Sequence, residues 1–516
     1  MTMVLRMYPR TAVILRSSRG ERLEGRTAVL AAFILLLAIA SVPLFSTVLP
    51  PLVDYPNHLA RLHLVAEGGN QFYAVHWAPL PDLAADLIVP ALARLVPLDL
   101  AGKIFLVLTF ALLAAGTVWL NRAATGCWRL WPLLAFLLLY DRILLWGFLN
   151  YLFGLGLAMC GLALWLSLDD KPVWRAGAST FVALACFLSH IAAFGVYALA
   201  VAGIELLPML RLRRTANYRG LAARLAIDAI PFVLPAILFL FFQPPSAGGP
   251  ISYGNFARKA DLLFSVFDNY SRPFDIACFA LFVALLAVLA WRRRLSIAPR
   301  LGGALAILFA AYLLLPSQMM TGSGVDRRIP IALFLLLIAA SAPRLPPRAA
   351  RLVGIGVVAM FLVRIAVIEA VWLHAGTLYA ADITVIDALP KAAKLAVAYP
   401  SRDVNAGAIP QLHVATLAAA RREAFVPTIF AYRTQQPLVL RPPYDTLAAR
   451  TSPAQLWAAF VGGDAGARAA AAPVLRDYDF IVFADREPFA VPADPCLKPV
   501  ASVLRFRLFA LQPGCF

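Results

Sequence analysis

The sequence predicts a polytopic α-helical membrane protein with about 11 transmembrane helices and a C-terminal external α/β domain. Its composition is the first reason: 61% of the 516 residues are hydrophobic, only 14% are charged, and the mean hydropathy is +0.77. Soluble proteins are less apolar and more charged than this. The second reason is the succession of apolar runs long enough to cross a bilayer, which stops before a more polar last quarter of the chain.

Eleven apolar segments are candidate spans, because a membrane-crossing helix needs about 20 mostly apolar residues. The stretch from Ala176 to Leu207 is long for one span, and we divide it at the polar pair Ser189-His190. The expected spans are 27–49, 101–120, 130–141, 146–168, 176–190, 192–209, 223–242, 273–291, 301–316, 330–342 and 352–372.

Lys and Arg are concentrated in alternate loops, which predicts that those loops and the N-terminal segment 1–26 are cytoplasmic. The first apolar run is as long as a true span and lacks a small-residue cleavage site, so it reads as a signal anchor. We expect a multi-pass protein of the bacterial inner membrane. The net charge of +18 is explained by this topology, and nucleic-acid binding is not expected.

Three predicted parts of the chain follow from this topology, of which the cytoplasmic segment 1–26 is the first. Residues 27–372 form the transmembrane domain, with long or polar external loops at 50–100, 243–272 and 317–329. Residues 373–516 alternate helix-like and strand-like segments and are expected to form a periplasmic α/β domain. Within it, Cys496 and Cys515 bracket an apparent strand, and a disulfide is expected because thiols outside the cytoplasm commonly pair.

The first external loop contains the strongest candidate site, Asp54-Tyr55-Pro56-Asn57-His58-Leu59-Ala60-Arg61. Asp54 with Pro56 predicts a helix start, and Gly68-Gly69 its end, for a helix lying along the membrane surface. On that helix Asp54, His58 and Arg61 are four and three positions apart, so they share one face. Asp54 is the candidate general base. The alternative is that its carboxylate only caps the helix.

Further candidates for substrate binding are polar residues in or next to the external loops. Asn57, His58 and Arg61 accompany Asp54, and a guanidinium could hold a phosphate through paired hydrogen bonds. Asp141 is either a second acid facing Asp54 or part of an interfacial turn. Arg364 lies inside the last span and must be functional or paired, with Glu369 available as a partner. The remaining candidates are His190, Arg258, Lys259, Asp326, Arg327 and Arg328, and the last two alternatively only flank a span.

This pattern resembles the GT-C superfamily of membrane glycosyltransferases, which use sugars carried on polyprenyl phosphates or diphosphates. The eight-residue stretch from Asp54 to Arg61 is similar to an Asp-Pro-x-x-His-x-Arg-like segment of oligosaccharyltransferase catalytic subunits, with one extra residue between Asp and Pro. By this resemblance Asp54 is the essential acid. Asp141 lies in the loop where those enzymes keep acidic metal ligands, but it stands alone. No WWDYG-like motif is present, so protein N-glycosylation is not expected.

The resemblance implies a glycosyltransferase, of inverting type, that moves a sugar from a polyprenyl-phosphate-linked donor to a glycan, lipid or protein acceptor at the outer membrane face. No HExxH or CxxC spacing indicates a metal site, although Mg²⁺ or Mn²⁺ remains compatible with the family. Two alternatives stay open at this point. One is a transporter or flippase of lipid-linked or polysaccharide substrates, and the other is a noncatalytic secretion scaffold.

Overall fold

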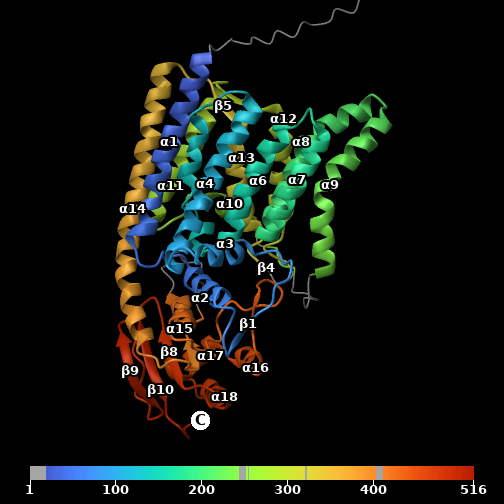
Figure 1. The fold of residues 1–516 in the computed structure, drawn as a ribbon. Helices are drawn as coiled ribbons and strands as arrows, with labels where there is room; N and C mark the ends of the chain where they lie inside the picture. Colours follow the sequence, from blue (N-terminus) through green and yellow to red (C-terminus); the bar gives the residue numbers. More distant parts are fainter. Residues whose placement is uncertain (1–18, 243–250, 254, 320–321, 402–410) are drawn as a thin grey trace, which may run out of the picture.

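The computed structural model describes residues 19–242, 251–253, 255–319, 322–401 and 411–516. A bundle of long apolar helices makes up most of the molecule, and a strand-containing domain lies at one end of the bundle (Figure 1). Residues 1–18 of the expected cytoplasmic segment lie outside the described residues. The same holds for 243–250, 254 and 320–321 of the expected external loops.

Eight helices in the described part of the chain are long and apolar enough to cross a membrane. Each coincides with one of the expected spans, which confirms the polytopic helical fold. They are α1 (Arg19–Ser46), α4 (Leu98–Thr125), α6 (Leu149–Ser167), α7 (Pro172–Ser189), α8 (Ile191–Arg214), α9 (Tyr218–Phe242), α11 (Arg272–Trp291) and α14 (Pro347–Asp387).

The other three expected spans are shorter elements. They are the 3-10 helix η1 (Trp131–Leu138), α12 (Pro299–Leu314) and α13 (Ile329–Ala340). A 12-residue α-helix such as α13 is only about 18 Å long, against roughly 30 Å of bilayer hydrocarbon. Both η1 and α13 are buried almost throughout. Hydropathy predicted spans here because it does not distinguish a helix facing lipid from one enclosed by other helices.

The break expected at Ser189-His190 is present. α7 ends at Ser189, His190 has an extended backbone, and its Nδ1 accepts the N–H of Ala192 at 3.0 Å as the cap of α8. α4 and α6 pack closely at the centre of the bundle through glycines. A Cβ on Gly116 would lie 2.7 Å from the Cβ of Met159, so only glycine permits this approach.

At the end of the bundle nearest the strand-containing domain, the chain forms several short elements. α2 (Tyr55–Ala66) begins one residue after Asp54 and stops before Gly68, as predicted. Nine of its twelve residues are buried, so it is enclosed between the bundle and the domain instead of lying exposed along a membrane surface. The others are β1 (Tyr73–Val75), α3 (Ala84–Leu92), α5 (Arg142–Trp146), α10 (Phe256–Phe264), β3 (Gln318–Met319), β4 (Gly322–Ser323) and η2 (Asp326–Arg328). At the opposite end of the bundle, β2 (Leu295–Ile297) pairs with β5 (Ser341–Pro343).

The C-terminal domain is built on a four-stranded sheet with the order β6-β8-β10-β9. β6 (Leu395–Ala398) and β8 (Phe480–Ala484) are parallel, whereas β10 (Phe506–Leu511) is antiparallel to both β8 and β9 (Leu497–Val503). β6 and β8 are buried and rich in apolar residues, as expected of strands at the centre of a domain. The helices of the domain are η3 (Gln411–Thr416), α15 (Leu417–Arg421), α16 (Tyr444–Arg450), α17 (Pro453–Phe460) and α18 (Ala465–Leu475).

A continuous helix and a pair of strands are among the connections that hold this domain to the bundle. α14 runs without interruption for 41 residues, from the far end of the bundle into the domain (Figure 1). The expected domain boundary at residue 373 therefore falls inside a helix. Separately, β1 in the loop after α2 pairs with β7 (Leu438–Leu440) of the domain, Tyr73 standing opposite Leu440.

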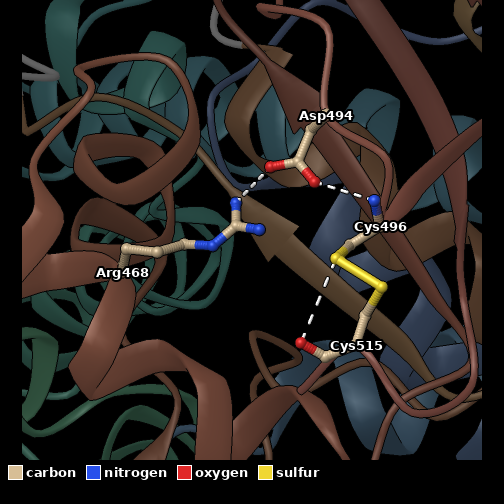
Figure 2. Close-up of a disulfide and its surroundings, with 4 residues drawn as sticks. All are labelled: Arg468, Asp494, Cys496 and Cys515. Carbon is tan, nitrogen blue, oxygen red and sulfur yellow. Dashed lines mark hydrogen bonds and ion pairs between the residues drawn. A yellow bond between two sulfur atoms is a disulfide. The ribbon is translucent and has the colours of Figure 1, made fainter.

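A disulfide joins Cys496 to Cys515, with their Cα atoms 5.5 Å apart. Figure 2 shows that Asp494 lies beside it, accepting the Cys496 N–H at 2.8 Å and pairing with Arg468 at 2.5 Å. The disulfide ties the C-terminal end of the chain to the start of β9.

Candidate active site

Backbone contacts hold Asp54 against the turn that follows α5. Val53 donates its N–H to the carbonyl of Leu145 at 2.8 Å, and Asp54 donates to that of Trp146 at 3.1 Å. Gly147 has a φ of +94°, and a Cβ there would lie 2.9 Å from the Asp54 Cβ. A glycine is therefore required at position 147, both for the left-handed backbone and for the close approach of Asp54.

The Asp54 carboxylate does not cap α2, because it makes no hydrogen bond to the first amides of the helix. It lines two neighbouring cavities, and its Oδ1 lies 3.4 Å from Nε2 of His413 in the C-terminal domain. Burial raises the pKa of Asp54 to about 7. The positive charge of Arg61 lowers that pKa, and the nearby Asp82 raises it. A carboxyl group with this pKa can exchange a proton near neutral pH.

The larger cavity has a volume of about 410 Å³ and carries net positive charge from Arg258 and Arg327. The guanidinium of Arg327 stacks 4.5 Å from the centre of the Trp146 ring. The cavity is lined by Val53, Asp54, Trp146, Phe148, Ser252, Arg258, Ser317, Gln318, Gly324 and Arg327. Residues from four separate segments of the chain thus meet around the Asp54 carboxylate.

The smaller cavity, of about 170 Å³, lies between the bundle and the C-terminal domain and shares Asp54 and Phe148 with the larger one. Arg328 lines it and stacks 4.4 Å from the Phe148 ring centre. His58 and His190 also line it. The remaining lining residues are Asp82, Gly147, Leu149, Asn150, Tyr151, Phe430, Tyr432, Gln435 and Gln436.

Asp82 is a lining residue that the sequence analysis missed. It has a φ of 126°, an uncommon conformation for a residue with a side chain, and Asn150 Nδ2 donates to its carboxylate at 2.9 Å. Burial raises the pKa of Asp82 to about 7, while Arg61 and the Asn150 hydrogen bond lower it. Its place in the same external loop as Asp54 was the one available signal.

His413 was also missed, although the sequence analysis noted Asn57, to which it is bound. Asn57 Nδ2 lies 3.2 Å from His413 Nδ1 and donates to the carbonyl of Thr428 at 2.9 Å. The Asn57 Oδ1 accepts the N–H of Phe430 at 2.7 Å. Asn57 lies outside both cavity linings and connects α2 to the C-terminal domain.

His58 and Arg61 do not share the cavity face that their spacing predicted. His58 lines the smaller cavity, with its Nε2 3.1 Å from the carbonyl of Gly147, and burial lowers the pKa of His58. Arg61 is fully buried and pairs with Asp86 of α3 at 2.8 Å. It lines neither cavity, so it influences Asp54 by its charge and not by contact with a ligand.

Four other candidates are held in structural contacts away from both cavities. Asp141 caps α5 by accepting the N–H of Leu144 at 2.8 Å. Lys259 donates to the carbonyls of Tyr312 and Leu315 and lies 3.4 Å from Asp326. Arg364 is paired, but with Asp275 at 3.0 Å; Glu369, the expected partner, instead accepts a hydrogen bond from Ser46.

Within the described residues, no group of three or more His, Cys, Asp or Glu side chains is arranged to hold a metal ion. The site as described consists of the Asp54 carboxylate between two cavities. Arg258 and Arg327 line the larger one, and Arg328, Asp82 and polar and aromatic side chains line the smaller one.

Two solved structures share this architecture along nearly the whole chain. They are ArnT from Cupriavidus metallidurans bound to undecaprenyl phosphate, with a TM-score of 0.50 and 13% identity, and the same protein in the apo state, with 0.51 and 14%. The alignments cover 95% and 94% of this chain, and 99% and 98% of the ArnT chains. This chain has the fold of the ArnT structures. No family model and no curated protein matches the sequence.

The shared fold covers both the membrane helices and the C-terminal domain, although the sequence identity is only 13% to 14%. At this identity the likeness concerns the course of the chain. The chemistry must be argued from the residues around Asp54.

Proposed function

We propose that this protein is a membrane glycosyltransferase of GT-C type that takes a sugar from a polyprenyl-phosphate-linked donor. The observation that carries the proposal is Asp54, a carboxylate with a pKa near 7 at the junction of two cavities, one of them lined by two arginines. A transferase needs such an arrangement, because a base must lie next to the attacking hydroxyl while cations stabilise the anionic leaving group.

The larger cavity is assigned to the phosphate and sugar of the donor. Arg258 and Arg327 both line it, and arginine binds phosphate through paired, charge-assisted hydrogen bonds. One of the two ArnT structures was solved with undecaprenyl phosphate, which supports a carrier of the same class here. The aromatic rings of Trp146 and Phe148 supply apolar surface beside the charges.

The smaller cavity is assigned to the acceptor. Gln435, Gln436 and Tyr432 of the C-terminal domain offer amide and hydroxyl groups, opposite His190 and Asp82 of the bundle. This cavity is lined by amides, imidazoles and aromatic rings, and it also holds the oppositely charged Arg328 and Asp82. Such a lining suits the hydroxyl groups and apolar ring faces of a carbohydrate. Asp54 is common to both cavities, so a hydroxyl bound here lies next to the donor.

In the reaction, the Asp54 carboxylate accepts the proton of an acceptor hydroxyl while that oxygen forms a bond to the anomeric carbon of the donor sugar. The bond between this carbon and the phosphate oxygen breaks, and the phosphate leaves with the electron pair. Arg258 and Arg327 stabilise the negative charge that develops on it. A single displacement of this kind inverts the configuration at the anomeric carbon.

The cavities are assigned to the outer face of a bacterial inner membrane, with a cytoplasmic N-terminus and a periplasmic C-terminal domain. α1 starts at the end of the bundle away from that domain, which fits an odd number of crossings between them (Figure 1). The arginine-rich loops are assigned to the same end of the bundle as the start of α1, in agreement with the preference of basic residues for the cytoplasm. A transporter is less well supported, since transport sites lie near the bilayer midplane between related halves, whereas Asp54 lies at one end of the bundle.

The test compares a deletion strain carrying wild-type protein with one carrying Asp54→Asn, at matched membrane levels. Mass spectrometry of envelope lipids and polysaccharides should find a glycosylated product that wild type restores and the variant does not. Purified wild-type protein should also bind undecaprenyl phosphate. An unchanged glycan profile with Asp54→Asn at normal levels would overturn the proposed mechanism.

A further inference from the structure

We propose that His413 is a positioning residue that orients Asp54 by donating its Nε2–H, and that Asn57 selects the histidine tautomer that makes this possible. The inference rests on the proposed function, because it assigns Asp54 the role of base. It makes the C-terminal domain part of the site, since His413 belongs to η3 of that domain.

The orientation of the Asn57 amide is the first step. The backbone N–H of Phe430 points at one Asn57 atom from 2.7 Å, and only an oxygen can accept it. The other amide atom is therefore the nitrogen, which donates to the carbonyl of Thr428 at 2.9 Å. Two backbone groups of one segment thus fix the side chain.

The tautomer of His413 follows from that orientation. The Asn57 nitrogen lies 3.2 Å from His413 Nδ1, and an amide nitrogen can only donate. Nδ1 must therefore be the unprotonated acceptor, and the ring proton of a neutral imidazole is on Nε2. Burial lowers the pKa of His413 to about 4, which keeps the ring neutral at pH 7.

The Nε2–H lies next to the base. The distance from Nε2 to Asp54 Oδ1 is 3.4 Å, long for a hydrogen bond, and such contacts commonly shorten when an enzyme binds its substrates. With Oδ1 held by His413, Oδ2 is left to accept the hydroxyl proton. The other charged or titratable groups that act on Asp54 or line its two cavities are Arg61, Asp82, His58, Tyr432, Arg258, Arg327, Arg328, His190 and Tyr151.

Aromatic packing restricts the ring of His413. The Phe430 ring meets both His413 and His58 edge to face, at centroid distances of 5.3 Å and 5.4 Å. The Oγ1 of Thr416 donates to the His413 carbonyl at 2.6 Å and fixes the backbone. The residue that gives its N–H to Asn57 is thus the same one that packs against the imidazole, so the ring and its tautomer are set by one segment.

The first experiment measures the tautomer directly. Full-length protein in nanodiscs is labelled with ¹⁵N-histidine, and the His413 signals are assigned by their loss in His413→Gln. At pH 7 we expect a neutral ring protonated on Nε2, changing to the Nδ1–H form or the imidazolium in Asn57→Asp, whose carboxylate can only accept. A wild-type ring protonated on Nδ1, or charged, would overturn the proposal. This readout does not depend on transfer activity.

The second experiment distinguishes a role of His413 in orienting Asp54 from a role in folding. It measures the glycosylated product that wild type forms and Asp54→Asn does not. His413→Met should lower turnover about 10- to 100-fold, leave the KM for the acceptor unchanged, and move the acidic limb of the pH profile to higher pH, because a donor to the carboxylate is lost. His413→Gln carries an amide N–H near the Nε2 position and should recover most of the rate and the profile. Equal loss in both variants with lowered melting temperatures would assign His413 a structural role only. If Asp54→Asn forms as much product as wild type, the proposed function is refuted, whichever tautomer His413 adopts.

Discussion

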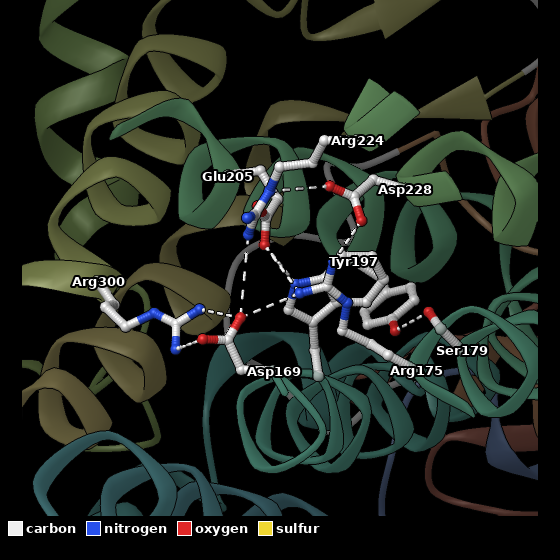
Figure 3. A network of polar contacts seen from close by, with 9 residues as sticks. Asp169, Arg175, Ser179, Tyr197, Glu205, Arg224, Asp228 and Arg300 are labelled. Carbon is white, nitrogen blue, oxygen red and sulfur yellow. Dashed lines mark hydrogen bonds and ion pairs between the residues drawn. The ribbon is translucent and has the colours of Figure 1, made fainter. Parts of the chain in front are cut away.

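Arg175 of α7 and Asp228 of α9 form a buried ion pair with a distance of 2.5 Å. Figure 3 shows the network around it: Glu205 of α8 lies 3.5 Å from Arg175 and pairs with Arg224 at 2.5 Å. The indole of Trp165 stacks on the Arg175 guanidinium at 4.4 Å. α9 is otherwise largely exposed in the described structure, so this network is a principal polar attachment of α9 to the bundle.

Arg175→Met is expected to destabilise the protein strongly, because it leaves Asp228 and Glu205 with less compensation in a buried site. Removing one partner of a buried pair typically costs about 3 to 5 kcal/mol. Thermal unfolding in detergent measures the loss. The matched control is Arg300→Gln, which breaks an exposed pair with Asp169 and should change the melting temperature little. Equal melting temperatures for the two variants would contradict the assignment.

Arg258→Gln and Arg327→Gln are each expected to weaken the binding of undecaprenyl phosphate about 10- to 100-fold, the worth of a hydrogen bond to a charged group. Native mass spectrometry or microscale thermophoresis with purified protein provides the affinity. Arg272→Gln is the control, because Arg272 is exposed, pairs with Asp261 and lines neither cavity. If all three variants bind equally well, the donor phosphate lies elsewhere.

The stability of the protein should respond to pH through Asp54. Its folded pKa of about 7 is above the ordinary value of 3.8 for an aspartate, so the folded state binds more protons than the unfolded state, and stability falls as pH rises from about 4 to about 7. Asp54→Asn removes the destabilisation caused by ionising the buried carboxyl group, which is on the order of 1 to 4 kcal/mol. We expect the variant to melt higher than wild type at pH 8 and close to it at pH 5. The same difference at both pH values would exclude an ionisable Asp54 as its source.

Cys496 and Cys515 should resist thiol reagents until the protein is reduced. Reduction, or a Cys496→Ser and Cys515→Ser pair, is expected to destabilise the C-terminal domain by about 2 to 4 kcal/mol, because the bridge restricts the unfolded chain. Peptide mapping after maleimide labelling reads out both thiols. Cys127, which is free and exposed, supplies an internal control that should be labelled without reduction. Labelling of Cys496 under the same conditions would refute the disulfide.

The sequence predicted what depends on local pattern. Apolar runs located the long helices, Pro56 and Gly68 delimited α2, and the pair Ser189-His190 divided α7 from α8. Of the candidate site residues, Asp54, His58, His190, Arg258, Arg327 and Arg328 line the two cavities. Helical spacing placed Arg61 beside Asp54 on one face, but it carried no information on α3, whose Asp86 takes Arg61 out of the cavity.

Local sequence patterns could not predict contacts between residues that are far apart in the chain. His413 lies in a domain that the sequence shows only as alternating helix-like and strand-like pieces, and its approach to Asp54 depends on how that domain docks. Arg364 illustrates the same point: a charge within an apolar helix demanded a partner, but only packing selected Asp275 of α11 over the nearby Glu369.

Because α14 is continuous, its residue count sets both the rotation and the distance of the C-terminal domain relative to the bundle. Each residue inserted into an α-helix turns everything beyond it by about 100° and advances it by about 1.5 Å. An insertion or deletion between residues 370 and 387 would therefore swing the domain around the axis of α14 and break the register of β1 with β7. In homologous proteins, changes of chain length are accordingly expected in the domain's loops, while this stretch of helix keeps its residue count.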